Sequence, residues 1–244
     1  MKQYGLIGFP LSHSFSPGYF ANKFEKEGIQ DASYEAFPIE RIELLSSLLK
    51  EKSPLGLNVT IPYKEQVIPL LDDIDDLAKR VGAVNTLLYK DGKLKGYNSD
   101  VIGFGNSLQP LLKPNHTKAL ILGTGGAAKA VQVALEELGI SYQYVSRQSN
   151  ENVITYNDID EELLNEYHLI INTTPLGMYP NTDAKPDLPY DILTSDHLLF
   201  DLVYNPEKTA FLLEGEQRGA QIKNGLEMLH LQAKASWEIW QENH

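Results

Sequence analysis

The stretch Ala119-Leu120-Ile121-Leu122-Gly123-Thr124-Gly125-Gly126-Ala127-Ala128 decides the fold of this chain. An apolar run, typical of a buried strand, leads directly into a glycine-rich turn and then into a helical pattern. The turn matches G-x-G-x-x-A in the strand–turn–helix context of dinucleotide-binding proteins, where the glycines let the backbone approach a pyrophosphate and the small Ala128 allows close packing. Free N–H groups at the helix start attract the anion. A turn that binds no ligand is the alternative. We expect cofactor contacts from Gly123, Thr124, Gly125, Gly126 and Ala127.

The end of the next expected strand, residues 142–146, bears on which dinucleotide binds. In NAD-binding domains an Asp or Glu about 20 residues after the first glycine hydrogen-bonds the ribose 2′-hydroxyl. Here Ser146 and Arg147 occupy that place, and Arg147 could pair with a 2′-phosphate and stack on adenine. Glu151, close by, has the wrong charge to reinforce such a contact. The sequence therefore favours NADP, while a solvated surface residue is the other interpretation of Arg147.

Short apolar runs alternate with helical patterns along almost the whole chain, which is typical of α/β units that build a mainly parallel sheet. A first helix is expected to have Ser16 as N-cap and Pro17 at N1, and to stop at Gly28. Further helices are expected at residues 40–50, 99–112, 127–138 and 225–244. Strands are expected at residues 4–7, 33–39, 55–61, 118–122, 142–146, 169–172 and 198–203, with a hairpin of 84–89 and 93–97 around Asp91-Gly92.

This order of elements predicts a two-domain α/β protein. Residues 1–100 are expected to form a first α/β domain, and residues 101–224 a Rossmann-type dinucleotide-binding domain. In the last helix, 225–244, apolar residues recur at helical spacing and need an apolar surface to cover. We expect this helix to return to the first domain and complete it, with Trp237 and Trp240 as packing residues.

Composition excludes several classes of function. The 244 residues carry a net charge of -12 and no basic run, which argues against binding of nucleic acid. The absence of cysteine removes thiolate chemistry and fits a cytoplasmic location. We expect no membrane span and no secretory leader, because no apolar run reaches the length that either the bilayer or a signal sequence needs. The six histidines show no metal-ligand spacing, so we expect no metal.

Polar residues gather at the ends of the expected strands in the first half of the chain. Asn58 and Thr60 share one face of a strand by its two-residue alternation, and Lys64 follows just after it. Asn85 and Asp100 follow further strand patterns, where open α/β sheets bind ligands. These groups could converge on a polyhydroxylated ligand. Taken singly, each Asn or Asp is better explained as a loop cap, and the lysine as a solvated surface residue.

Eight motifs, in this order along the chain, closely resemble the shikimate dehydrogenase family. They are Leu11-Ser12-His13-Ser14-Phe15-Ser16-Pro17, Asn58-Val59-Thr60-Ile61-Pro62-Tyr63-Lys64, Gly82-Ala83-Val84-Asn85-Thr86, Gly96-Tyr97-Asn98-Ser99-Asp100, residues 123–128, residues 172–178, residues 201–206, and residues 224–229 with Gln232-Ala233. The resemblance covers essentially the whole chain. It implies reversible reduction of 3-dehydroshikimate to shikimate by NADPH, on the route to chorismate and the aromatic amino acids, by a monomer or homodimer.

The resemblance also implies roles for individual residues. Lys64 is implied as the proton donor and acceptor, with Asp100 holding it in place. Substrate contacts are implied for Ser14, Ser16, Asn58, Thr60, Asn85, Tyr204 and Gln232. Cofactor contacts are implied for Thr174, Leu202, Gly225 and Met228, in addition to the glycine turn and Ser146-Arg147. His13 is expected to anchor its loop rather than to take part in catalysis.

Two alternatives stay open at this point. An NAD-using quinate/shikimate dehydrogenase is expected to carry an acid where Ser146-Arg147 stands. A catalytically inactive, nucleotide-sensing homologue is expected to lack the proton-transfer lysine or part of the substrate loop. The chain keeps Lys64, Asp100 and both serines. The residues thus favour the NADP-dependent enzyme over both alternatives.

Overall fold

The computed structural model describes residues 1–11 and 14–242, and the chain divides into two compact units. Residues 1–102 and 232–244 make the first unit, and residues 103–231 make the second. Both boundaries fall inside helices, α5 (Ser99–Leu108) and α9 (Leu226–Glu242). The sequence placed the boundaries after residues 100 and 224, so the start of α9 lies in the second unit rather than the first.

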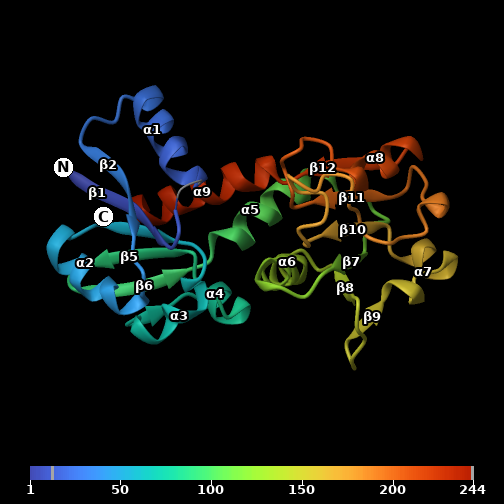
Figure 1. Cartoon of the computed structure of the whole chain (residues 1–244), viewed down its shortest axis with the longest axis horizontal. Helices are drawn as coiled ribbons and strands as arrows, with labels where there is room; N and C mark the ends of the chain where they lie inside the picture. The colour runs from blue at the N-terminus through green and yellow to red at the C-terminus, as the bar shows by residue number, and fades with distance from the viewer. Residues whose placement is uncertain (12–13, 243–244) are drawn as a thin grey trace. The chain divides into compact units, whose positions relative to one another are not determined.

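The first unit is built on a mixed six-stranded sheet with the order β2-β1-β3-β5-β6-β4. β1 pairs in parallel with β2 and β3, and β4 pairs in parallel with β6, whereas β5 runs antiparallel to its neighbours β3 and β6. The strands are β1 (Lys2–Gly8), β2 (Ala32–Pro38), β3 (Gly56–Val59), β4 (Asp73–Ile74), β5 (Thr86–Lys90) and β6 (Lys93–Tyr97) (Figure 1). The predicted hairpin is confirmed, because Asp91 and Gly92 at its tip have φ angles of 53° and 75°. The expectation of a mainly parallel sheet is confirmed for this unit, because β5 alone among its six described strands runs against the others.

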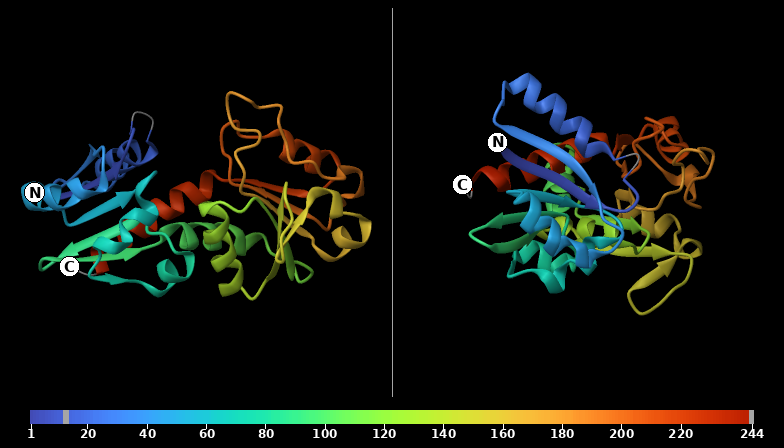
Figure 2. Two further views of the ribbon diagram at one scale, coloured as in Figure 1. Left: turned by 60° about the horizontal axis from the view of Figure 1, so that its bottom comes forward. Right: turned by 60° about the vertical axis from the view of Figure 1, so that its left-hand side comes forward.

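Helices cover both faces of this sheet. Because successive side chains of a strand point to opposite faces, the apolar residues of these strands form two separate cores. Ile7, Leu57 and Leu87 pack with α2 (Leu45–Lys52), α3 (Tyr63–Gln66) and α4 (Asp76–Val81). Tyr4 and Leu88, on the opposite face, pack with α1 (Phe15–Glu27) and α9. α1 lies along β2 (Figure 2). The interior of the first unit therefore depends on the last helix of the chain.

Trp240 joins α9 to this sheet. Its ring is fully buried, stacks on Tyr4 at 4.9 Å between ring centroids, and donates its Nε1–H to the carbonyl oxygen of Leu87 at 2.9 Å. Trp237 contacts Tyr4 edge-on at 5.2 Å. The prediction that both tryptophans are packing residues is confirmed.

The first helix begins earlier than predicted. Its N-cap is Ser14 rather than Ser16, and Pro17 lies at the third helical position. Proline is accepted there because the first N–H groups of a helix have no partner inside it. The stop at Gly28 is confirmed, since this residue has a left-handed φ of 66°. Ser12 and His13, and with them the expectation for His13, lie outside the described residues.

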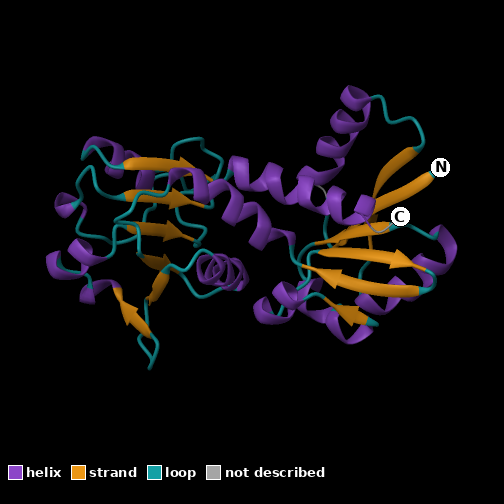
Figure 3. Ribbon diagram, turned by 180° about the vertical axis from the view of Figure 1, so that it is seen from behind, coloured by secondary structure: helices purple, strands orange, loops and turns teal. Residues whose placement is uncertain are grey.

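The second unit is built on a fully parallel six-stranded sheet with the order β12-β11-β10-β7-β8-β9 (Figure 3). The chain runs outward from β7 through β8 to β9, then returns to the centre at β10 and runs outward through β11 to β12. This order is that of the doubly wound dinucleotide-binding fold, whose switch point lies between β7 and β10. The strands are β7 (Lys118–Leu122), β8 (Ser141–Ser146), β9 (Val153–Thr155), β10 (Leu169–Asn172), β11 (Leu198–Asp201) and β12 (Gln221–Asn224).

Helices pack on this parallel sheet as well. α6 (Gly126–Glu137) packs on β7 and β8, and α8 (Ala210–Gln217) on β11 and β12. α7 (Glu161–Glu166) contributes Leu164 to the core beside Leu120 and Ile170. Short 3-10 helices lie at residues 42–44, 68–70, 109–111, 156–158 and 190–192. Among the described residues, no helix is both long and apolar enough to span a bilayer.

Candidate functional site

Lys64 and Asp100 form an ion pair in the first unit, with 2.7 Å between Nζ and Oδ2. Lys64 lies in α3, directly after β3, and Asp100 lies in the first turn of α5. Asn98 fixes that turn, because its Oδ1 accepts the backbone N–H groups of Asp100 and Val101 at 3.1 and 3.3 Å. Asn98 therefore caps α5. Both side chains of the ion pair keep partial access to solvent, 35% for Lys64 and 20% for Asp100.

Ser14 and Ser16 lie at the N-terminus of α1. Ser14 occupies the N-cap position, yet its side chain makes no capping hydrogen bond. The Ser16 hydroxyl hydrogen-bonds the hydroxyl of Tyr34, whose pKa is raised above its usual range by burial. Tyr34 is therefore a neutral phenol at physiological pH, and it donates to Oδ1 of Asn58 at 2.8 Å. A hydroxyl pair at a helix N-terminus suits an anionic ligand group.

The polar residues at the strand ends take different positions. Asn58 and Asn85 are buried, 5% and 4% exposed, while Thr60 is half-buried just after β3. The backbone N–H of Thr60 donates to the carbonyl oxygen of Ile7 at 3.0 Å, which extends the β1–β3 pairing by one residue. Gln232, on α9, has its Oε1 3.4 Å from the hydroxyl of Ser99. These residues and the Lys64–Asp100 pair all belong to the first unit.

The glycine turn in the second unit has the backbone that its sequence predicts. Gly123 has a φ of 103°, and a Cβ placed there would lie 2.9 Å from Oγ1 of Thr173. Gly125 is the N-cap of α6 and Gly126 its first residue, and neither would bring a Cβ within 4 Å of another group. The start of α6 is therefore open, and its N–H groups fit a pyrophosphate. Ala128 is fully buried, as the close helix–strand packing requires.

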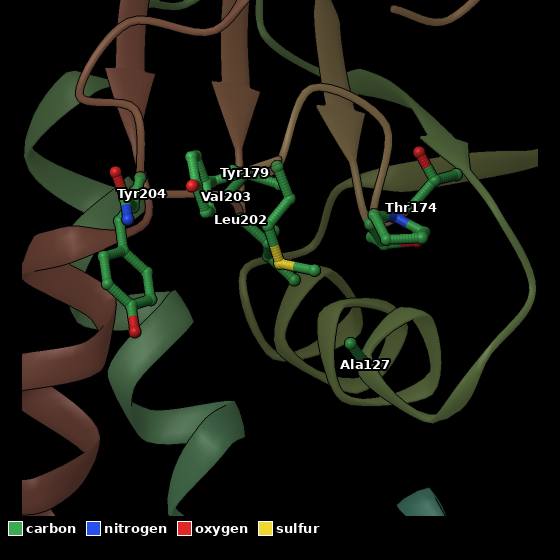
Figure 4. Close-up of a pocket in the computed structure, with 10 residues that line it drawn as sticks. Ala127, Thr174, Tyr179, Leu202, Val203 and Tyr204 are labelled. Atoms are coloured by element: carbon green, nitrogen blue, oxygen red, sulfur yellow. The ribbon is translucent and has the colours of Figure 1, made fainter. Parts of the chain in front are cut away.

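A pocket of about 420 Å³ lies at the carboxyl ends of β10 and β11. Figure 4 shows Ala127 of α6 on one side of it, with Thr174, Leu202 and Tyr204 from the loops that follow the two strands. The remaining lining residues are Thr173, Pro175, Met178, Tyr179, Val203 and Asn205. This is where an open parallel sheet binds its ligand.

Asn172 and Asp201 hydrogen-bond the two loops that line the pocket, and each other. Oδ1 of Asn172 accepts both the backbone N–H and the hydroxyl of Thr174, at 3.0 and 2.6 Å. Its Nδ2 donates to Oδ1 of Asp201 at 2.9 Å. Burial raises the pKa of Asp201 to about 6, although hydrogen bonds from Thr209, Val203 and Asn172 oppose the shift. The loops are thus tied together through one buried carboxylate.

Eight of the eleven predicted cofactor residues lie outside the lining of this pocket: Gly123, Thr124, Gly125 and Gly126 of the glycine turn, and Ser146, Arg147, Gly225 and Met228. Ser146 ends β8, and Arg147 follows it. The preceding residue, Val145, accepts the backbone N–H of Gly123 at 2.8 Å, which places Arg147 beside the glycine turn. At Gly225 an added Cβ would come within 2.1 Å of the carbonyl oxygen of Leu202. Met228 is 9% exposed.

Sequence reasoning missed Tyr179, Val203 and Asn205 in the pocket lining. It also missed the roles of Tyr34, Thr86, Ser99 and Ser236, which hydrogen-bond the predicted residues Asn58 and Asn85. Thr86 and Ser99 stand next to predicted residues and could have been included on that ground. Ser236 carried one signal: it lies one helical turn after Gln232.

The doubly wound sheet, its glycine turn and the pocket at the strand ends define a dinucleotide-binding α/β protein, with a second polar site on a separate unit. A family model described as the shikimate dehydrogenase substrate binding domain matches residues 6–87. A shikimate dehydrogenase (NADP(+)) from Staphylococcus epidermidis is 42% identical over 250 residues, which cover 98% of this chain and 91% of the relative. The chain belongs to the shikimate dehydrogenase family.

Solved structures agree with this assignment. The shikimate 5-dehydrogenase from Thermus thermophilus in complex with NADP(H) and shikimate is 33% identical, with a TM-score of 0.85 and coverage of 99% of this chain and 94% of that one. The shikimate 5-dehydrogenase from Listeria monocytogenes in complex with shikimate and NAD is 28% identical, with a TM-score of 0.91 and coverage of 99% and 92%. The predictions of the fold class and of the family are confirmed.

Proposed function

We propose that this chain catalyses the NADPH-dependent, reversible reduction of 3-dehydroshikimate to shikimate. The observation that carries the proposal is the Lys64–Asp100 ion pair, a proton-transfer group held at 2.7 Å by a carboxylate and still open to solvent. It stands in the same unit as a set of hydroxyl and amide groups suited to a polyhydroxylated acid. The chain belongs to the shikimate dehydrogenase family, and we therefore assign that family's reaction to these groups.

Lys64 is proposed to move the proton. When bound, NADPH supplies the hydride that reduces the substrate carbonyl carbon. The Lys64 ammonium then donates a proton to the carbonyl oxygen, and in the oxidation direction the same nitrogen takes it back. Asp100 accepts one of the three Nζ protons, which fixes the side chain and leaves the other two for the substrate oxygen.

The other predicted substrate residues are proposed to recognise the carboxylate and the ring hydroxyls. Ser14 and Ser16 place two hydroxyl groups at the N-terminus of α1, whose positive dipole end favours a bound carboxylate. The ring hydroxyls and the reacting oxygen are assigned to Thr60, Asn85 and Gln232, with Tyr204 in support. Asn58 has both ends of its amide engaged by protein groups, so its contribution is proposed to be mainly orientation of its neighbours.

The residues present fit NADP. The open helix start at Gly125 and Gly126 suits the pyrophosphate, and Thr174 and Leu202 line the pocket proposed for the nicotinamide half. Gly225 and Met228 are assigned next to that half, since Gly225 touches the backbone of Leu202. Ser146 ends β8 and Arg147 follows it, at the place where a 2′-phosphate is expected in this fold. Neither residue is an acid that would repel the phosphate.

A four-way rate measurement tests the proposal. Purified protein is assayed for nicotinamide absorbance with shikimate or quinate, each combined with NADP or NAD. We expect fast oxidation of shikimate with NADP, and slow or no reaction in the other three mixtures. Comparable rates with NAD would leave the enzyme in place but remove the role of Arg147. No reaction in any mixture would refute the proposal and favour a nucleotide sensor.

We extend the proposal to the cellular location and the oligomeric state of the enzyme. We place it in the cytoplasm, acting as a monomer or a homodimer on a small-molecule substrate. Fractionation of cells and sedimentation of the purified protein test these two points separately.

A further inference from the structure

A cluster of three hydroxyl groups lies inside the first unit, on residues with no exposed surface: Thr86, Ser99 and Ser236. The hydroxyl oxygen of Ser236 is 2.8 Å from that of Thr86 and 3.1 Å from that of Ser99. The oxygens of Thr86 and Ser99 are 3.2 Å apart. The three residues come from β5, α5 and α9, so the cluster links the closing helix to α5 and to an interior strand of the sheet.

This cluster fixes the amide of Asn58. Nδ2 of Asn58 donates to the hydroxyl of Ser236 at 2.9 Å, whereas its other acceptors, the carbonyl oxygen of Asn85 and the hydroxyl of Thr86, lie at 3.3 and 3.4 Å. At the opposite end, Oδ1 accepts the hydroxyl of Tyr34 at 2.8 Å. The carbonyl oxygen of Asn85 can only accept, so it fixes the amide nitrogen on that side, and the hydroxyls of Ser236 and Tyr34 complete the contacts of the nitrogen and the oxygen.

The same cluster fixes the amide of Asn85. Its Oδ1 accepts the backbone N–H of Ser99 at 2.7 Å and lies 3.1 and 3.2 Å from the hydroxyls of Thr86 and Ser99. These donors converge on the oxygen and turn the amide nitrogen away from them. Ser99 also lies 3.4 Å from Oε1 of Gln232. One buried group of hydroxyls thus touches two amides proposed to bind substrate, those of Asn85 and Gln232, and the Asn58 amide that orients its neighbours.

We propose that Ser236 is a positioning residue for the substrate. Its hydroxyl links Asn58 to Thr86 and Ser99, and through them sets the orientation of the amides that read the ring hydroxyls. This inference rests on the function proposed above. A buried helical serine that has only a packing role needs one hydrogen-bond acceptor, a backbone carbonyl one turn earlier. Ser236 has that acceptor, the carbonyl oxygen of Gln232 at 3.0 Å, so its contacts with other side chains are additional to what packing requires.

Ser107 provides the matched control. It is also a buried helical serine, 1% exposed, and its hydroxyl donates to the carbonyl oxygen of Phe104 at 2.9 Å. It belongs to the second unit, whereas the hydroxyl cluster belongs to the first. Replacement of either serine by alanine removes one buried hydroxyl from a helix. Any effect special to Ser236 must therefore come from its additional partners.

The experiment compares Ser236→Ala with Ser107→Ala in steady-state oxidation of shikimate by NADP. We expect Ser236→Ala to raise the KM for shikimate by about 3- to 10-fold, as loss of one hydrogen bond predicts. The KM for NADP should stay at its wild-type value, and Ser107→Ala should change neither constant. An unchanged KM for shikimate, or a parallel rise in both KM values, would overturn the inference.

A second variant covers the case in which Ser236→Ala does not fold. Tyr34→Phe removes the other partner of the Asn58 amide, and we expect the same selective rise in the KM for shikimate. If both variants fold, the rise in the double variant should be smaller than the product of the single effects, because Ser236 and Tyr34 share Asn58, whereas any part of the Tyr34 effect that passes through Ser16 would be multiplicative. Independent, fully multiplicative effects would contradict the linkage. An inactive wild-type protein would overturn the proposed function and this inference together, whereas unchanged variants of an active protein overturn only the inference.

Discussion

Lys64 and Asp100 lie 36 residues apart in the chain. Their ion pair forms because Lys64 follows the end of β3 and Asp100 lies at the start of α5, and the fold brings these two places together. We predict that Lys64→Met, which keeps the length of the side chain and removes its proton, lowers kcat by about 100- to 10,000-fold, the usual contribution of a general acid. The affinity for NADP, measured by fluorescence titration, should stay close to that of the wild type.

Lys79→Met is the matched control for this prediction. Lys79 lies in the same unit, and its Nζ is 3.1 Å from Oδ1 of Asp76 in an exposed pair. Exposed pairs contribute little, so turnover should be unaffected. Near-normal turnover in Lys64→Met would show that another group moves the proton.

Arg147 carries the prediction about cofactor choice. A guanidinium that pairs with the 2′-phosphate contributes roughly 1.5–3 kcal/mol as a charged hydrogen bond, which is about 10- to 150-fold in binding. Arg147→Ala should therefore raise the KM for NADP within that range and leave the KM for NAD unchanged. NAD serves as the internal control because it lacks the phosphate. Equal effects on both cofactors would mean that Arg147 supports the loop rather than the phosphate.

At the scale of elements, the start of α9 depends on a close approach between two backbones. A Cβ at Gly225 would lie 2.1 Å from the carbonyl oxygen of Leu202, and a backbone atom cannot move aside as a side chain can. We predict that Gly225→Ala lowers the stability of the protein by about 1–3 kcal/mol, the usual cost of overpacking. In a chain of this size that is a fall in Tm of roughly 2–12 °C, measured by thermal unfolding.

Gly18→Ala is the control for this substitution. Gly18 lies inside α1, where an added Cβ meets nothing within 4 Å. Alanine should leave Tm unchanged or raise it slightly, because it is the better helix former. If Gly225→Ala behaves like Gly18→Ala, the close approach to Leu202 does not constrain α9.

Elements with strong local signals were predictable from the sequence. The run 119–122 and the glycines after it predicted β7 and α6, because a buried parallel strand and an anion-binding turn each need particular residues. The three residues of β9 carry too little periodicity to be recognised. The start of α1 was misplaced because Pro17 fits any position in a first turn.

The candidate site was predictable only in part, for a related reason. Motif residues such as Lys64 and Asp100 can be recognised from the residues next to them in the chain. The partnership of Ser236 with Thr86 joins residues 150 positions apart, and it exists only once α9 has packed on the sheet. Long-range hydrogen bonds of this kind leave no local pattern in a sequence.

At the scale of the whole molecule, acid should destabilise the protein through two buried histidines of the second unit. In His116, Nδ1 accepts the backbone N–H of Lys113 and Nε2 lies 3.1 Å from the carbonyl oxygen of Asp196. In His197, Nδ1 accepts the N–H of Thr194 and Nε2 lies 3.0 Å from the carbonyl oxygen of Leu164. Only the neutral ring satisfies both nitrogens. Burial accordingly lowers the pKa of both histidines, and the positive charge of Lys113 adds to the effect on His116.

The unfolded chain therefore binds more protons at these histidines than the folded chain does, so their contribution makes stability fall as pH drops below about 6.5. Asp201 opposes this trend: its folded pKa of about 6 lies above the ordinary value of 3.8, so its contribution to stability falls as pH rises through that interval.

We predict that His116→Asn combined with His197→Asn, which keeps a hydrogen-bond acceptor near the position of each Nδ1, removes the loss of stability between pH 6.5 and pH 5. Urea unfolding at a series of pH values measures this. The profile of the double variant should be flat or should rise toward acid because Asp201 remains, and Asp201→Asn in the same background should remove that rise. A double variant that loses stability in acid as steeply as the wild type would assign the sensitivity to other groups.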